Sequence, residues 1–131
     1  MTGINIQAPW SQLLISGQKC VETRSYPLPD KYVGVELALI ETPGKKGKFK
    51  SRIIGTITFI HSFQYPDEIA WENDYNRHKV PSDDTNYSWN TKPKYGWVVC
   101  QVTKFDKPIP APKKKGIIFT NGCIIKRQKA A

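Results

Sequence analysis

The sequence has few of the residues from which metal centres and disulfide frameworks are built. Its 131 residues include three cysteines and two histidines. The number of cysteines is odd, and Cys20, Cys100 and Cys123 do not stand at metal-ligand spacing. We therefore expect reduced, buried or inert thiols, no metal and no cofactor.

Long apolar segments are also missing. No run approaches the about 20 apolar residues that a membrane-spanning helix requires. The N-terminus lacks the basic and then apolar pattern of a signal peptide. Hydrophobic residues make up 39% of the chain, which is enough for a globular fold. The expectation is a soluble, cytoplasmic protein with no membrane contact and one domain over residues 1–131, and the oligomeric state is left open.

Acidic residues are few in comparison with basic ones. Eleven Asp and Glu residues face 20 Lys and Arg residues, and the formal net charge is +9. Such a chain is attracted to polyanions, of which nucleic acid is the commonest inside cells. The basic residues cluster at positions 45–52, 113–115 and 126–129. These clusters either contact phosphates beside a binding face or are plain solvated loops.

Apolar periodicity predicts several short strands and two helices. The predicted strands cover residues 3–7, 20–26, 32–41, 52–62 and 95–105, and the helices cover 9–16 and 68–77. Asn121-Gly122 favours a hairpin between residues 117–119 and 123–125. Gly55 indicates a bulge or a tight barrel bend. These elements predict an α+β fold, a small mixed β-barrel of five to six strands with two or more short helices.

The segment from Pro9 to Arg24 concentrates charge beside an apolar helix. Trp10 lies on the apolar helical face, and Gly17 is suited to the left-handed backbone that follows a helix end. Alternation along the following strand places Glu22 and Arg24 on one face. They either form a structural ion pair that closes the mouth of the barrel or present an acceptor and a forked donor to one ligand.

This segment resembles the ASCH domain signature, a proline-aromatic helix followed by Gly-x-Lys-x-x-Glu-x-Arg. ASCH domains belong to the PUA-like superfamily, so the resemblance implies a pseudo-barrel with a cleft of nucleic-acid size. Some relatives are amidohydrolases of acetylated cytidine with a threonine nucleophile three residues after the lysine. This chain has Glu22 there, which cannot replace the alcohol in that acyl transfer. Other members are implied to bind or cleave RNA.

Three functions follow as hypotheses. The first is nucleic-acid binding, RNA preferred, with RNA or a nucleotide-like ligand in a charged cleft where Lys19 contacts phosphate or a base and Arg24 clamps phosphate bidentately. The candidate binding residues are Trp10, Lys19, Glu22, Arg24, Tyr26, Tyr95, Lys46 and Lys48. The second is a hydrolase of RNA or of a modified nucleoside, with Lys19 and Glu22 as catalytic residues. The third is a protein-interaction adaptor barrel.

Aromatic side chains are the expected stacking surfaces for bases. The candidates in or beside loops are Tyr26, Tyr65, Tyr87, Trp89 and Tyr95. Trp10, Trp71 and Trp97 lie on periodic elements that are typical of core residues, although Trp10 is also a candidate for the cleft.

Overall fold

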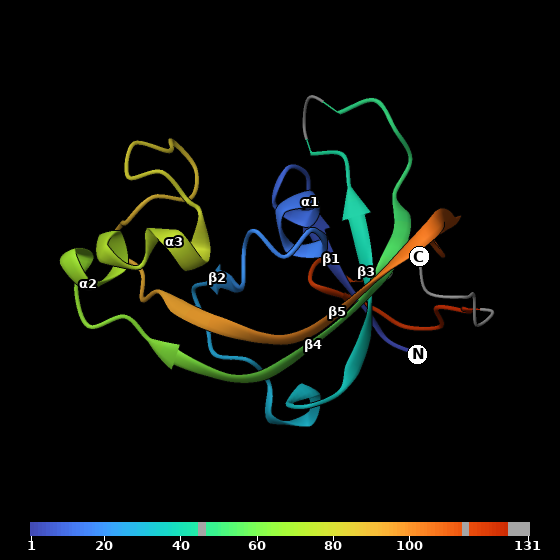
Figure 1. Ribbon diagram of the computed structural model, residues 1–131, viewed down its shortest axis with the longest axis horizontal. Coiled ribbons are helices and arrows are strands. Elements are labelled where there is room, and N and C mark those ends of the chain that lie inside the picture. The colour runs from blue at the N-terminus through green and yellow to red at the C-terminus, as the bar shows by residue number, and fades with distance from the viewer. Residues whose placement is uncertain (45–46, 114–115, 126–131) are drawn as a thin grey trace.

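The computed structural model describes residues 1–44, 47–113 and 116–125, in which six strands form one mixed sheet (Figure 1). The strands are β1 Gly3–Gln7, β2 Val21–Arg24, β3 Glu36–Thr42, β4 Arg52–Gln64, β5 Tyr95–Pro110 and β6 Phe119–Thr120. Their order in the sheet is β2-β5-β4-β3-β1-β6, with β1 and β3 parallel and the other neighbours antiparallel. The helices are α1 Trp10–Ile15, α2 Glu68–Asn73 and α3 Tyr75–His78, and the 3-10 turn η1 covers Asp30–Tyr32. The predicted α+β class and small barrel-like sheet are confirmed.

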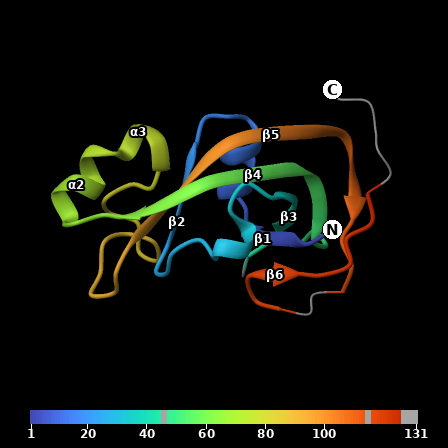
Figure 2. The same ribbon diagram turned by 90° about the horizontal axis from the view of Figure 1, so that it is seen from below.

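The two long strands β4 and β5 give the sheet its curvature. They run side by side through the molecule, and α2 and α3 lie beyond one end of the pair (Figures 1 and 2). Their register shifts between Ile53 and Gly55, so the predicted bulge is confirmed. A Cβ atom at Gly55 would lie 2.1 Å from the carbonyl oxygen of Thr103, so only glycine permits this close approach.

Curling of the sheet brings its edge strand β2 close to β1. These strands are not neighbours in the sheet, yet Arg24 Nη2 on β2 donates a hydrogen bond of 3.2 Å to the Asn5 carbonyl on β1. The sheet is therefore a half-barrel with a seam between β1 and β2, and Arg24 spans that seam.

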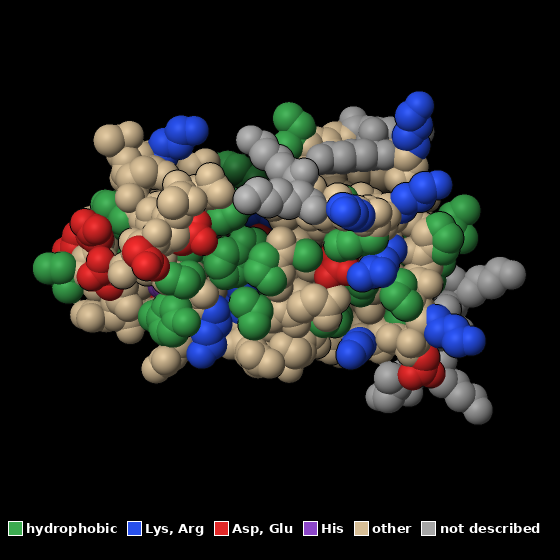
Figure 3. Space-filling model, turned by 90° about the horizontal axis from the view of Figure 1, so that it is seen from above, with side chains coloured by type: hydrophobic (Ala, Val, Ile, Leu, Met, Phe, Trp, Pro, Cys, Tyr) green, Lys and Arg blue, Asp and Glu red, His purple; other side chains and the backbone are tan. Residues whose placement is uncertain are grey.

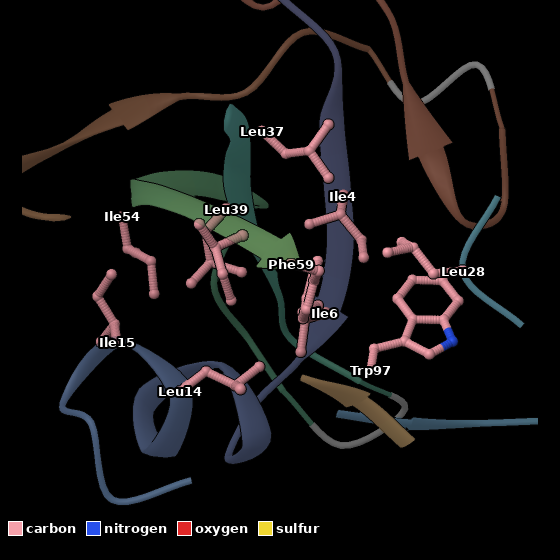
Figure 4. Close-up of a cluster of buried hydrophobic side chains, with 11 residues drawn as sticks. Ile4, Ile6, Leu14, Ile15, Leu28, Leu37, Leu39, Ile54, Phe59 and Trp97 are labelled. Atoms are coloured by element: carbon pink, nitrogen blue, oxygen red, sulfur yellow. The ribbon is translucent and has the colours of Figure 1, made fainter. Parts of the chain in front are cut away.

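The inner face of the half-barrel packs against α1. Leu14 and Ile15 point from α1 into the main cluster of buried side chains (Figure 4). This cluster also contains Ile4, Ile6, Leu28, Leu37, Leu39, Ile54, Ile57, Phe59 and Trp97. On β3, Ala38 and Ile40 belong to a second cluster, so this strand is buried on both faces.

Three elements differ from the sequence prediction by more than two residues or in their continuity. β3 begins at Glu36 because the chain first makes the η1 turn, and Val33 and Val35 are exposed. The helix predicted over 68–77 divides into α2 and α3 at Asp74, although Asp67 caps its start by accepting from Ala70 N at 2.8 Å. β5 continues to Pro110 because it pairs with β4 as far as Arg52.

The hairpin predicted at Asn121-Gly122 does not form. Phe119–Thr120 pairs with β1 instead, and Cys123 N donates to the Met1 carbonyl. β1 provides an open strand edge here, and pairing with it replaces the local turn.

The three cysteines are unpaired thiols. Cys123 is buried, Cys20 is half-buried and Cys100 is exposed on β5. The described α-helices have six residues or fewer, and none has the length and apolar character needed to cross a bilayer.

Candidate functional site

A cavity opens at the seam between β1 and β2. It has a volume of about 310 Å³. Asn5 to Gln7 of β1 form one wall and Glu22 to Arg24 of β2 form the other. Among the described residues, β1 pairs with β6 at Gly3 and Ile4. One further backbone hydrogen bond joins Asn5 N to the Ile118 carbonyl. Beyond Asn5, this edge of β1 has no strand beside it in the described sheet, so it lines the cavity.

Lys19 lies at the base of the seam and is almost completely buried, with 1% of its surface exposed. Its Nζ donates to the His78 carbonyl at 2.5 Å and lies 3.6 Å from Glu22 Oε1. The ammonium also lies 5.3 Å from the centroid of the Trp10 ring. Burial lowers the pKa of Lys19, and the negative charge of Glu22 partly opposes that shift.

The two oxygens of Glu22 have different surroundings. Oε2 accepts from Arg24 Nε at 3.2 Å and from Arg24 Nη2 at 3.0 Å. Among the described residues, no donor lies within hydrogen-bond distance of Oε1, whose nearest cation is Lys19. Glu22 is thus held in place by hydrogen bonds to one oxygen, and its other oxygen forms an ion pair with Lys19 at the cavity.

Arg24 is largely committed to protein partners. Its Nε and Nη2 hydrogens bond Glu22 and the Asn5 carbonyl, and Nη1 donates to the Tyr26 hydroxyl at 3.4 Å. Burial alone would lower the pKa of Arg24, but Glu22 and Tyr26 outweigh it and the pKa is raised. Arg24 therefore stays charged, and within the described part of the chain one Nη1 hydrogen has no partner. In this arrangement its forked edge faces Glu22 rather than a ligand.

His78 fixes the carbonyl that receives Lys19. Its Nδ1 accepts from Val80 N at 2.9 Å, so Nε2 carries the hydrogen that is donated to the Trp71 carbonyl at 2.6 Å. The ring stacks on Trp71 at 4.8 Å between centroids. Burial lowers the pKa of His78, and the bond that Nδ1 accepts from Val80 N requires the neutral ring, whereas the bond to the Trp71 carbonyl opposes the shift.

The long loop between α3 and β5 closes over the cavity through Tyr87. The Tyr87 hydroxyl donates to Gln7 Oε1 at 2.9 Å, and its ring packs edge-on against Trp10 at 5.7 Å. Asp84 Oδ1 accepts from Tyr87 N at 2.7 Å, and Lys94 Nζ donates to the Tyr87 carbonyl at 2.7 Å. These bonds hold an otherwise polar loop against the seam.

The structure brings four predicted residues together, namely Trp10, Lys19, Glu22 and Arg24. Trp10 is half-buried beside the cavity, while Trp71 and Trp97 are core residues as expected. Tyr26 lines an adjoining cavity.

Three other predicted positions are not part of this group. Tyr95 pairs with Arg24 in the sheet but lines neither cavity at the seam. Lys48 is exposed and also absent from both linings. Lys46 lies outside the described residues, as does much of the three basic clusters.

The remaining loop aromatics have mixed positions. Tyr65 is buried with its hydroxyl bonded to Asp74, and Trp89 packs against Trp71. Tyr87 alone of these three lines the cavity.

Several lining residues were not identified from the sequence. They are Asn5, Ile6, Gln7, Thr23, Thr42, Val80 and Ile117. The alternation of Asn5 and Gln7 with the buried Ile4 and Ile6 was a usable signal for the first wall. The contribution of Ile117, more than 90 residues away from β2, had no local signal. Over the described ranges, no three His, Cys, Asp or Glu side chains are grouped to hold a metal ion.

Charge is distributed unevenly over the surface. On the face shown in Figure 3, acidic side chains gather at the end that carries α2 and α3, and Lys and Arg lie mainly over the rest of the molecule. The exposed acidic residues of that end include Asp67, Glu68, Glu72 and Asp83. These carboxylates therefore form a solvated helical end and do not line the seam cavity.

No family model and no curated protein sequence matches the chain. Among solved structures, the chain is similar to the ASCH protein of Zymomonas mobilis, with 21% identity over 83% of this chain and 72% of that one and a TM-score of 0.59. A serine-to-alanine variant of the Zymomonas mobilis protein matches at 16% identity over 91% and 85% of the two chains, with a TM-score of 0.62. A tyrosine-to-phenylalanine variant matches at 18% identity over 83% and 74%, with a TM-score of 0.59. The half-barrel with its seam between β1 and β2 therefore has the ASCH domain fold.

Proposed function

We propose that this protein binds single-stranded nucleic acid, RNA in preference to DNA, with a nucleotide in the seam cavity. The observation that carries the proposal is the Lys19 ammonium beside Glu22 Oε1, which form an ion pair 3.6 Å apart at a cavity of about 310 Å³. A donor next to an acceptor matches the adjacent polar atoms on the edge of an unpaired base. The choice of RNA rests on the resemblance to ASCH domains.

The surroundings of the pair support this ligand class. Trp10 and Tyr87 supply aromatic surface at the cavity, and Arg24 supplies a permanent positive charge. The net charge of +9 favours association with a polyanion. The affinity for RNA should therefore have two contributions. Contacts with phosphates weaken as the salt concentration rises, whereas contacts inside the cavity depend less on salt.

A titration of fluorescently labelled single-stranded RNA hexamers tests the proposal by anisotropy at 50 and 200 mM salt. We expect Glu22→Gln to weaken binding about tenfold, because the variant loses the carboxylate acceptor and its hold on Arg24. Lys104→Ala is the control, since Lys104 is exposed on β5 and lines neither cavity at the seam. Absence of binding at 50 mM salt, or affinity that salt does not change, would overturn the proposal.

A second candidate function is hydrolysis of RNA or of a modified nucleoside. It is favoured by the buried Lys19 ammonium, which lies 3.6 Å from Glu22 Oε1 at the cavity, because burial lowers the pKa of this lysine and makes it a better proton donor than an exposed one. Turnover of RNA or of acylated nucleosides that is lost in both Lys19→Ala and Glu22→Gln would support it. Turnover that survives in both variants would exclude these two residues from catalysis.

An adaptor role would be favoured by a cleft filled with side chains. The seam cavity is open to a ligand, so we place protein interaction behind the other two functions.

A further inference from the structure

The seam cavity adjoins a second cavity of about 370 Å³. Its lining includes Ser25, Tyr26, Asn86, Asn90 and Lys92. Four residues line both cavities, namely Thr23, Arg24, Tyr87 and Ile117. The two hollows are therefore consecutive parts of one groove, and each lies near the lower end of the roughly 300–1,000 Å³ typical of small-ligand sites.

The boundary between the two cavities carries a fixed positive charge. Arg24 is anchored by Glu22, the Asn5 carbonyl and the Tyr26 hydroxyl, which leaves one Nη1 hydrogen without a partner in the described part of the chain. An anchored guanidinium with a remaining donor is suited to one phosphate oxygen. A phosphate at this position would lie between the two hollows.

The two cavities differ in charge chemistry. The first contains the Lys19–Glu22 pair and so presents a donor beside an acceptor. No carboxylate lines the second, as far as the described residues extend, and its polar groups are amides, hydroxyls, lysines and the shared guanidinium of Arg24. Lys94 Nζ is occupied by the carbonyls of Tyr87 and Ser88, which leaves Lys92 as the exposed cation of that lining.

An exposed apolar side chain marks the same boundary. Ile117 is 84% exposed, and Asn5 Nδ2 holds its loop by donating to the Gly116 carbonyl at 3.2 Å and the Ile117 carbonyl at 3.4 Å. An isoleucine held in this position gains burial when the flat face of a sugar or base covers it.

We propose that the ligand is a single strand bound through two successive nucleotides, one in each cavity, with the linking phosphate at Arg24. This inference rests on the proposed function and specifies its ligand. The first nucleotide presents its base edge to Lys19 and Glu22. The second lies among Tyr26, Asn86 and Lys92, where the contacts depend less on base identity.

The inference is tested by calorimetric titration with 3′-UMP, UpU and UpUpU. The same series is then titrated for each of the other three bases. UpU carries one phosphate, as 3′-UMP does, and less negative charge, so any gain in affinity reports the second nucleoside rather than electrostatics. We expect UpU, or its counterpart in the best-binding base, to bind at least tenfold more tightly than the mononucleotide. The third nucleotide should add less than threefold.

Variants separate the two cavities. Ile117→Ala and Lys92→Ala should each weaken the dinucleotide several-fold. Lys92→Ala should leave the mononucleotide unchanged, and Lys104→Ala should change neither. Equal affinity for mononucleotide and dinucleotide, or equal gains at the second and third nucleotides, would overturn the two-nucleotide groove but leave the proposed function standing. Failure of every mononucleotide, dinucleotide and hexamer to bind would overturn both.

Discussion

Two buried carboxylates in this molecule have opposite surroundings. Glu41 on β3 is saturated, because Oε2 accepts from Ser11 Oγ at 2.7 Å and Gln12 Nε2 at 2.6 Å, and Oε1 accepts from Arg52. Within the described part of the chain, Glu22 on β2 receives hydrogen bonds only at Oε2, and its Oε1 lies beside Lys19 at the seam cavity. Both pair with an arginine, so the ion pair itself does not distinguish them.

The difference shows how a binding group can be separated from a structural one. A carboxylate whose lone pairs are all used has nothing to offer a ligand, whereas a carboxylate oxygen at a cavity that accepts no hydrogen bond from the protein can still accept one. The two groups meet at α1, since Ser11 and Gln12 anchor the helix to Glu41 and Trp10 at its start faces the seam cavity. Glu41 thus stabilises the position of the site without entering it.

The largest effect is expected when the structural carboxylate is removed. Glu41→Ala leaves the buried Ser11 hydroxyl and the Arg52 guanidinium without their acceptor, so the free energy of unfolding should fall by about 2–4 kcal/mol. Urea denaturation followed by tryptophan fluorescence measures this change. RNA affinity of the folded variant should stay within about twofold of the parent, and a stability loss below about 1 kcal/mol would contradict the structural role.

The matching change at the seam should act mainly on binding. Lys19→Met replaces a buried ammonium with an apolar side chain of similar length; Arg24 still neutralises Glu22, but the His78 carbonyl loses its donor, so the free energy of unfolding should fall by about 1–2 kcal/mol, less than for Glu41→Ala. Its affinity for single-stranded RNA should fall about tenfold, which corresponds to about 1.4 kcal/mol. A large loss of stability with unchanged RNA affinity would assign Lys19 to structure, as for Glu41.

The neutral state of His78 predicts a pH dependence of stability. An unfolded histidine has a pKa near 6.5, and burial lowers the pKa of His78 in the folded state. This contribution is present above about pH 6.5 and is lost as the pH falls toward the folded-state pKa, because the unfolded chain then binds more protons. We expect about 1 kcal/mol less stability at pH 5.5 than at pH 7.5.

Two controls isolate this contribution. The lowered pKa values of Glu41 and Asp74 affect stability only as the pH falls below about 4.5, outside the measured window. The lowered pKa of Lys19 acts in the same direction as that of His78, so the measurement is repeated in Lys19→Met. The exposed His61 provides the His61→Gln control, which should keep the pH dependence. Stability that is flat between pH 5.5 and 7.5 would contradict the neutral, buried ring.

The smallest effect is expected at the loop that closes the seam. Tyr87→Phe removes the hydroxyl bond to Gln7, worth about 0.5–1.5 kcal/mol, and keeps the ring against Trp10. Amide exchange in residues 82–91 should therefore accelerate several-fold while global stability changes little. Unchanged exchange would show that Asp84 and Lys94 alone hold the loop.

The sequence predicted the strands well where the burial of apolar side chains alone determines the local structure. Alternation along β4 and the double-sided apolar pattern of β3 both reflect burial that the residues themselves specify. Prediction failed where the chain had a competing partner elsewhere. Asn121-Gly122 favours a hairpin, but residues 119–120 pair with the open edge of β1 instead.

The candidate site was predictable in its charged residues and not in its walls. The Pro9 to Arg24 segment already contains the helix, the glycine stop and the charged strand, because these depend on neighbours within a few residues. The tertiary structure alone decides that β2 meets β1 across a seam, that Tyr87 and Ile117 border the cavity, and that the fork of Arg24 faces Glu22. Those contacts join residues up to about 110 positions apart. They follow from how far the bulged β4–β5 pair curls the sheet, which no short stretch of residues encodes.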